Sequence, residues 1–176
     1  VDITSHKDTE QALENASDYL HNIINAVPNP IFLKDRQHRW CFFNNAFCRL
    51  LGYSRNFLLG KTAEDVLPKT EAALFHQKDD LLFTTGQEDV GEETFTDAAK
   101  VAHTVLTRRV LYTDPQERQF IVGTITDITE RQRVEEQLRK SETLLSAIFN
   151  GVSVGICLTD ANGCFVQVNP AYCRLY

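Results

Sequence analysis

Two stretches of the chain carry hydrophobic residues at helical spacing. In the first, from Thr9 to Asn25, the apolar positions fall at alternating intervals of three and four: Leu13, Ala16, Leu20 and Ile23. In the second, from Glu130 to Asn150, the same intervals select Val134, Leu138, Ser141, Leu145 and Ile148. Such a heptad-like stripe predicts two amphipathic helices. Each helix could pair with its counterpart in a second chain or lie on its own domain, and the pattern leaves both open.

The segment between these helices has the pattern of a small mixed domain. Pro28 and Pro30 end the first helix, because proline cannot continue it. Helices are expected at 45–51, after an Asn44 N-cap, and at 70–85. Short apolar runs predict strands at 31–34, 39–43, 89–96, 102–112 and 118–126. This order predicts an α+β fold: one five-stranded antiparallel sheet with short helices on one face, flanked by the two amphipathic helices.

A repeat with an offset of 125 positions suggests where the domains begin and end. It relates Asp35 to Asp160, Asn44 to Asn169, and Asp2-Ile3-Thr4 to Asp127-Ile128-Thr129. A fixed period of this kind indicates repeated modules. We therefore predict four segments: the end of a preceding copy with a linker helix at 1–18, one complete domain at 19–129, a linker helix at 130–142, and the first part of a following copy at 143–176.

The composition limits which partners the chain can bind and which cellular compartment suits it. The 176 residues are 43% hydrophobic and 24% charged, as in ordinary globular domains. A net charge of -6 argues against nucleic acid or an anionic membrane, because binding phosphates needs a basic face. The five cysteines are an odd number without a Cys-x-x-Cys pair, which favours free thiols over disulfides or zinc. We expect a cytoplasmic domain, in a parent that could be membrane-associated, with no nucleic acid, no direct membrane contact and no metal.

Several short motifs then resemble the PAS family of sensory domains. They are the hairpin around Asp35, Phe43-Asn44-Asn45-Ala46-Phe47-Cys48, Leu51-Gly52-Tyr53-Ser54, Leu59-Gly60-Lys61-Thr62, and a closing strand that leads into Asp127-Ile128-Thr129-Glu130-Arg131. The resemblance covers about 19–131 and resumes near Thr143. It implies a module whose sheet and helices enclose a small cavity and whose flanking helix passes a conformational change to an output domain.

The resemblance also implies an output and a set of relay residues. The output is most often a histidine kinase of a two-component phosphorelay, and less often a diguanylate cyclase or phosphodiesterase. The signal would leave through the closing motif and the helix after it, at Asp127, Ile128, Thr129, Gln132, Val134, Leu138 and Leu145. Thr129 and Gln132 also have the spacing of a capping box. Expected partners are a second copy of the chain, through the flanking helices, and the neighbouring PAS and output domains.

Two cofactors found in the family are not expected here. Flavin-binding light sensors need an Asn-Cys-Arg motif, and Gly60-Lys61-Thr62-Ala63-Glu64-Asp65 occupies that stretch without a cysteine. Haem-binding members use a histidine on the long helix, where this chain has His76. However, Leu74, Leu81 and Leu82 define the apolar face of that helix, and His76 lies off it. His76 is therefore not expected to bind haem, and the cofactor stays unknown.

Aromatic and apolar residues on the predicted strands and long helix could line a ligand pocket. The candidates are Phe32, Trp40, Phe42, Phe75, Leu82, Val105, Arg108 and Ile121. Strand alternation lets only one of Arg108 and Arg109 face inward, and Arg108 is our candidate for an inward cation that binds an anion such as a carboxylate. The same side chains could instead fill a core without any ligand. No catalytic motif stands out, so we expect no enzymatic activity in this chain.

Overall fold

The computed structural model describes residues 3–175, with side chains from Gln11 onwards except those of Leu13 and Glu14. The predicted repeat position Asp2 and the stripe residue Leu13 therefore lie outside what it describes. The chain divides after Thr129 into two compact units, which we describe separately.

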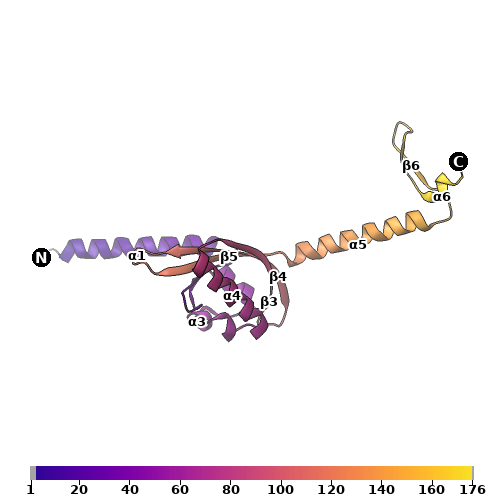
Figure 1. The fold of residues 1–176 in the computed structure, drawn as a ribbon. Helices are drawn as coiled ribbons and strands as arrows, with labels where there is room; N and C mark the ends of the chain where they lie inside the picture. Colours follow the sequence, from indigo (N-terminus) through magenta and orange to yellow (C-terminus); the bar gives the residue numbers. More distant parts are fainter. Residues whose placement is uncertain (1–2, 176) are drawn as a thin grey trace. The chain divides into compact units, whose positions relative to one another are not determined.

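The first unit contains the helices and strands predicted up to residue 126 (Figure 1). Each agrees with its expected bounds to within one residue except the first helix, which begins at Ile3 rather than at Thr9. Its helices are α1 (Ile3–Ala26), α2 (Asn45–Leu51), α3 (Arg55–Leu58) and α4 (Lys69–Thr85), with a short 3-10 turn at Ala63–Asp65. Its strands are β1 (Ile31–Lys34), β2 (Trp40–Phe43), β3 (Asp89–Thr96), β4 (Ala102–Thr113) and β5 (Gln119–Asp127).

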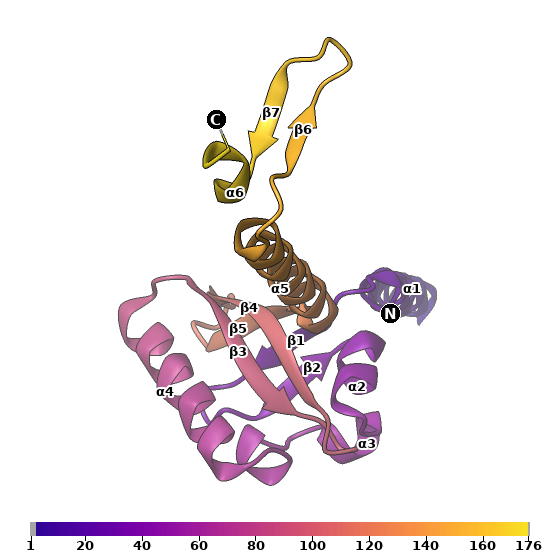
Figure 2. The same ribbon diagram turned by 90° about the vertical axis from the view of Figure 1, so that its right-hand side faces the viewer.

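The five strands form one antiparallel sheet in the order β2-β1-β5-β4-β3. The first and last hairpins therefore meet in the middle of the sheet, where β1 pairs with β5. The short helices gather beside the sheet (Figure 2), and side chains of α2 and α4 reach the same inner face of β1. The predicted α+β fold with a five-stranded antiparallel sheet is confirmed.

The close pairing of β1 with β5 depends on a glycine. Gly123 lies opposite Phe32 in the register of the two strands. A Cβ atom at Gly123 would lie 2.0 Å from Cζ of Phe32, so the ring occupies the space that any other residue would need. Gly123 thus lets Phe32 lie flat across β5 and reach the core.

Asn44 holds the start of the unit together through five hydrogen bonds. Its side-chain oxygen accepts from the backbone N–H groups of Ile31 (3.0 Å) and Phe47 (3.0 Å), the second as the N-cap of α2. Its amide donates to the carbonyls of Ile24, Val27 and Asn29. Asn44 is fully buried, so these bonds join the end of α1, the linker, β1 and α2 at one point.

The apolar face of α4 differs from the expected one. Leu82 is buried as predicted, but Leu74 and Leu81 are 59% and 62% exposed. The face that meets the sheet contains Ala72, Phe75, Asp79 and Leu82, which follow helical spacing of three and four. Because this face includes a buried aspartate, Asp79, the pattern of apolar residues along α4 did not indicate it.

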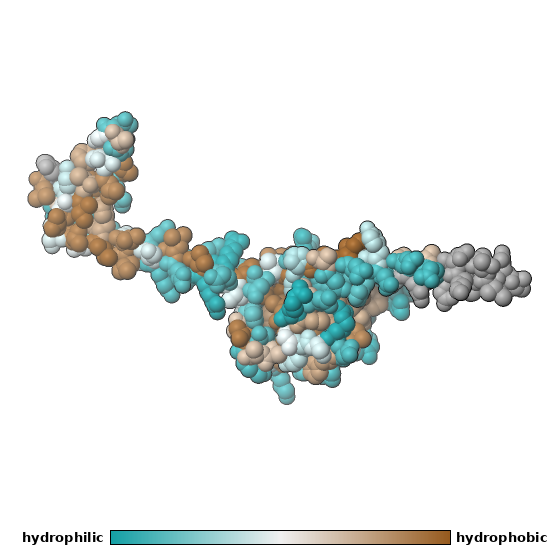
Figure 3. Space-filling model, turned by 180° about the vertical axis from the view of Figure 1, so that it is seen from behind, coloured by the Kyte–Doolittle hydropathy of each residue, from teal (hydrophilic) through white to brown (hydrophobic). Residues whose placement is uncertain are grey.

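The second unit begins within α5 (Thr129–Gly151), followed by β6 (Cys157–Thr159), β7 (Phe165–Val168) and α6 (Pro170–Cys173). Its Asn169 is fully buried and repeats most of the bonds of Asn44: it accepts from Ile156 and Tyr172 and donates to the carbonyls of Phe149 and Val154. Apolar surface is extensive on this unit (Figure 3), with Val154, Leu158, Phe165, Val166 and Leu175 exposed.

The two long helices carry exposed apolar residues at the predicted stripe positions. Leu20 and Ile23 are exposed on α1, and Val134, Leu138, Leu145 and Ile148 are exposed on α5. In the part of the chain that the structure describes, no helix combines the length and the apolar character that crossing a membrane requires.

Candidate functional site

A small internal cavity of about 40 Å³ lies between the inner face of the sheet and helices α2 and α4. Most of its wall is apolar and aromatic, and four polar residues form the remainder. The lining residues are Phe32, Lys34, Trp40, Phe47, Leu51, Leu67, Phe75, Glu93, Phe95, Val105, Thr107, Arg109 and Ile125. This volume holds about three water molecules, since one needs roughly 10–15 Å³.

Half of the residues expected in the pocket lie in its wall. Phe32, Trp40, Phe75 and Val105 line the cavity. Leu82 and Ile121 are buried in the adjoining hydrophobic core without lining it. The remaining two, Phe42 and Arg108, lie elsewhere.

A β-bulge accounts for the position of Phe42. The register of β1 and β2 shifts between Leu33, opposite Phe42, and Lys34, opposite Trp40, so Cys41 is an extra residue on β2. Trp40 and Phe43 consequently both face the core, whereas Phe42 is only half-buried and contacts the ring of His21 on α1 at 6.2 Å between centroids. The expectation for Phe42 was wrong because it assumed uninterrupted alternation.

The arginine that faces inward is Arg109, and the choice of Arg108 was wrong. The Arg108 side chain is 65% exposed and bonds Glu88, while that of Arg109 is 3% exposed and lines the cavity. Only one of the two faces inward, as alternation requires. The sequence alone does not determine which of the two arginines faces inward, because both faces of β4 carry polar and apolar residues.

Arg109 belongs to a buried network of charged side chains from four elements. It donates two hydrogen bonds to Glu93 on β3, at 2.8 and 2.7 Å, and its Nε lies 3.3 Å from Asp79 on α4. Asp79 also accepts a 2.6 Å hydrogen bond from the Lys34 amine on β1. Lys78 and Asp89 extend the network toward solvent, bonding Glu93 and Arg109 respectively. The charges of this network therefore neutralise one another within the protein.

The two buried carboxylates are held ionised by these cations. Burial acts to raise the pKa of Asp79, but the charge of Lys34 and the bonds from His38 and Lys34 outweigh it, so this pKa is lowered. Burial likewise opposes ionisation of Glu93, and the bonds and charge of Arg109 lower its pKa. Sequence reasoning missed Lys34, Asp79 and Glu93. For Lys34 a signal existed, because it lies two positions after Phe32 on β1, and residues two apart on a strand share one face.

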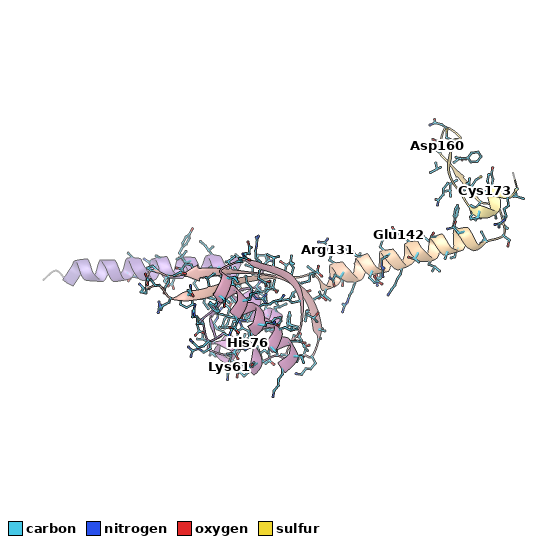
Figure 4. The ribbon with its side chains drawn as sticks, in the orientation of Figure 1. Lys61, His76, Arg131, Glu142, Asp160 and Cys173 are labelled. Carbon is cyan, nitrogen blue, oxygen red and sulfur yellow. The ribbon has the colours of Figure 1, made fainter. Side chains whose placement is uncertain are left out.

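Two histidines lie beside this network. His38, in the β1–β2 turn, stacks on His76 of α4 with 4.3 Å between ring centroids, and Figure 4 marks His76 on that helix. His38 also bridges Asp79 (3.5 Å) and Asp80 (3.1 Å). The bond to Asp79 raises the pKa of His38, whereas burial and then the neighbouring His38 lower the pKa of His76. His76 thus packs against a second histidine and Glu64, outside the cavity wall.

A second cluster lies where β5 ends and α5 begins. Asp127 accepts a hydrogen bond from the backbone N–H of Thr129 (2.9 Å) and contacts Nδ1 of His103 (2.9 Å). The hydroxyl of Thr129 accepts from the backbone N–H of Thr104 (2.9 Å), and the N–H of Ile128 donates to the carbonyl of Thr104 (2.9 Å). The predicted relay residues Asp127, Ile128 and Thr129 therefore hold the start of α5 against the first residues of strand β4.

His103 connects this junction with the cavity. Its ring stacks on Phe95, a cavity-lining residue directly opposite it in the β3–β4 register, with 5.1 Å between centroids. Its Nε2 lies 3.3 Å from Asp97. Burial acts to raise the pKa of Asp127, but the bonds from Thr129 and His103 lower it. The other predicted relay residues, Gln132, Val134, Leu138 and Leu145, lie along α5 in the second unit.

Residues suited to metal or thiol chemistry are sparse. Among residues 3–175, no three His, Cys, Asp or Glu side chains are grouped so that they could hold a metal ion. The five cysteines are free, and only Cys48 is partly buried. Although Cys41 is exposed overall, partial desolvation of its thiol and the nearby charge of Asp35 raise its pKa, and burial raises that of the Cys48 thiol. A raised thiol pKa lowers the fraction of reactive thiolate.

Comparisons with known proteins agree with the fold. The family model described as "PAS fold" matches residues 18–128, and a second, "PAS domain", matches 143–176. The chain is 34% identical over 122 residues to the uncharacterized protein y4lL of Sinorhizobium fredii, and 26% identical over 145 residues to the virulence sensor protein BvgS of Bordetella bronchiseptica. These matches cover 68% and 80% of this chain.

A solved structure with the same fold is the PAS domain of an HTR-like protein from Haloarcula marismortui. The two are 20% identical with a TM-score of 0.60, over 69% of this chain and 99% of that one. By contrast, this chain spans only 15% of y4lL and 12% of BvgS. With a family model matching well over half of its residues, the chain belongs to the PAS family.

Proposed function

We propose that this chain is a sensory and relay module of a larger signalling protein, in which the state of the core cavity is passed to α5. The observation that supports this most is the unbroken series of contacts from the cavity wall to the start of the helix. Phe95 lines the cavity and stacks on His103, which bonds Asp127. Asp127 in turn accepts the first N–H of α5. Movement of Phe95 would therefore act on the residues that hold the helix start.

A pair of variants tests this relay within the chain itself. Phe95→Leu should accelerate hydrogen exchange of the Ile128 and Thr129 amides, because it loosens the His103–Asp127 contact. Phe75→Leu is the matched control: Phe75 also lines the cavity, but from α4 and without a ring contact to His103. After correction for global stability, we expect about a tenfold larger effect in Phe95→Leu. Equal effects of the two variants would mean that the junction does not respond to the cavity wall.

The output of the parent protein is a second part of the proposal. Similarity to the virulence sensor protein BvgS supports a sensor histidine kinase in a two-component phosphorelay. The free thiols favour a reducing compartment, so we place the module in the cytoplasm. In this view the chain performs no reaction, and α5 carries the signal through Gln132, Val134, Leu138 and Leu145.

Autophosphorylation of the full-length parent tests this assignment. Asp127→Ala should change the autophosphorylation rate severalfold, because it releases Thr129 and His103. Asp114→Ala is the control, since Asp114 makes the same kind of bonds, to Gln116 and Arg118, in the β4–β5 turn. A parent that never autophosphorylates would exclude the kinase.

The exposed stripe of α5, together with the small size of the cavity, favours a second function, in which the module relays strain without a ligand. The cavity is small, while the apolar stripe of α5 is exposed, including Leu138 at 60% and Leu145 at 63%. A module of this kind would act as a dimerisation element, for instance in a diguanylate cyclase or phosphodiesterase. A chain that is monomeric at every concentration would exclude this second function, and its oligomeric state is treated in the Discussion.

A further inference from the structure

The charges around the cavity restrict what the cavity can hold. Two cationic residues, Lys34 and Arg109, line it, and each is bonded to a buried carboxylate, Asp79 or Glu93. At the rim Lys78 and Asp89 add one charge of each sign. A protonated His38 would add one positive charge outside the wall, where the exposed Asp80 faces it. The wall is therefore close to electrically neutral.

A charged occupant would find no uncompensated partner in this wall. An ion that enters must either stay unpaired in a water-poor site or displace a carboxylate or cation from its present bonds, and both are unfavourable. An uncharged molecule carries no such penalty. The inward Arg109, already bonded to Glu93, is therefore not expected to bind a carboxylate.

Among the charged residues that line the cavity itself, the unused hydrogen-bonding capacity lies mainly with donors, including the buried Nε of Arg109. Asp79, whose Oδ1 also lacks a hydrogen bond, is not part of the lining. The lysine ammonium has three N–H donors, and the described contacts of Lys34 use one, toward Asp79. Glu93, the acidic group in the wall, already accepts from Arg109 through both oxygens and from Lys78, and the Thr107 hydroxyl also bonds it. An occupant would therefore be recognised as a hydrogen-bond acceptor.

Aromatic rings fix the remainder of the site. The Lys34 amine lies 5.5 Å from the ring centroid of Phe32 and 5.8 Å from that of Trp40. Phe47, Phe75 and Phe95 close the other sides. A molecule with its acceptor atom at Lys34 would place its other atoms among these rings, so an apolar body is favoured.

We infer that the cavity binds a small uncharged molecule with one hydrogen-bond acceptor and an apolar body, such as a short amide, ketone or nitrogen heterocycle. The inference rests on the proposed sensory function, because it assumes that the cavity is the sensory site. Lys34 supplies the donor, the Asp79 and Glu93 pairs maintain neutrality, and the aromatic rings hold the body.

Three probes of nearly equal shape test the charge and the acceptor together. Acetamide is neutral, acetate is its anionic counterpart and acetamidinium its cationic counterpart, with four non-hydrogen atoms each. Trp40 is the single tryptophan of the chain and lines the cavity, so its indole N–H signal in NMR spectra reports occupancy. We expect saturable shifts of this signal and of the Val105 and Thr107 amides with acetamide, in the millimolar range, and binding at least about tenfold weaker for both ions.

The variant Glu93→Gln should reverse the preference for an uncharged probe over an anionic one. It removes one negative charge while keeping the size of the side chain, so the wall becomes net positive and acetate should gain relative to acetamide. Equal binding of all three probes by the unaltered chain, or preference for acetate, would overturn the inference. Absence of binding by every probe would overturn it as well. The proposed relay from the cavity wall to α5 would still be tested separately by the hydrogen-exchange rates in Phe95→Leu, because that experiment needs no ligand.

Discussion

At the scale of single residues, the carboxylate of Asp79 joins three parts of the first unit. From α4 it faces Lys34 on β1, His38 in the adjoining turn and Arg109 on β4. It is completely buried, and its Oδ1 has no hydrogen bond of good geometry in the described structure. A buried charge of this kind is stable only while its partners remain, so its removal should be costly.

We predict that Asp79→Asn lowers the free energy of unfolding by about 3–5 kcal/mol, because it leaves buried cations without a full counter-charge. The next residue supplies the control: the Asp80 side chain is 69% exposed, and Asp80→Asn should cost less than about 1 kcal/mol. Urea unfolding of both variants measures the difference. A loss in Asp79→Asn as small as in Asp80→Asn would show that the network contributes little to stability.

The pKa values of the two stacked histidines, His38 and His76, should be shifted in opposite directions from the ordinary value of 6.5. His38 has a raised pKa, so its protonated form stabilises the fold fully below pH 6.5, and this contribution is lost as the pH rises through the raised pKa. His76 has a lowered pKa, so its neutral form is favoured above pH 6.5, and that contribution is lost as the pH falls through the lowered pKa.

An NMR titration of the two imidazoles measures both midpoints. We expect the midpoint of His38 above 6.5 and that of His76 below it. In His38→Asn the decline of stability above pH 6.5 should disappear. Asparagine suits this position because His38 has a φ of 60°. A common midpoint for both rings would contradict the assignment of Asp79 as the group that holds the proton on His38.

At the scale of elements, the contact between β1 and β5 closes the sheet over the cavity. We predict that Gly123→Ala costs at least about 1–3 kcal/mol, because the new methyl group would displace the Phe32 ring from the cavity wall. Gly151→Ala is the control, since a Cβ there meets no atom within 4 Å. Thermal unfolding compares the two. If Phe32→Leu is added, the cost of Gly123→Ala should shrink, and strict additivity would argue against this steric account.

The elements themselves could be predicted well from sequence, and the site only in part. Strand and helix bounds follow from local signals, such as the Asn44 cap before α2 and Gly86 at the end of α4. The pocket required knowing which face each element turns inward. The bulge at Cys41 reversed one face, and the polar members Lys34, Asp79 and Glu93 are buried against the usual preference of charged residues. Their burial depends on partners that are distant in sequence, which no local pattern reveals.

At the scale of the whole molecule, the exposed stripe of α5 predicts self-association. Leu138→Asn with Leu145→Asn should shift the chain from dimer toward monomer in analytical ultracentrifugation, because the stripe would form the seam between two helices. Leu144→Asn is the matched control: Leu144 is 61% exposed but lies off the stripe. A chain that is monomeric at all concentrations would exclude dimerisation through α5 and the ligand-free function with it.

The Asn44 bonds have a consequence for the order in which the module folds. All five join groups no more than 20 positions apart, whereas β1 and β5 residues such as Phe32 and Gly123 are 91 positions apart. Contacts between near neighbours close at a smaller loss of chain entropy, so the hairpin and its asparagine can form early. Asn169 makes the matching bonds in a unit whose described residues form one sheet, the β6–β7 hairpin, beside helices α5 and α6. The cavity, in contrast, exists only once β5 has joined β1, so a nascent chain has no cavity until β5, the last strand of the first unit, is in place.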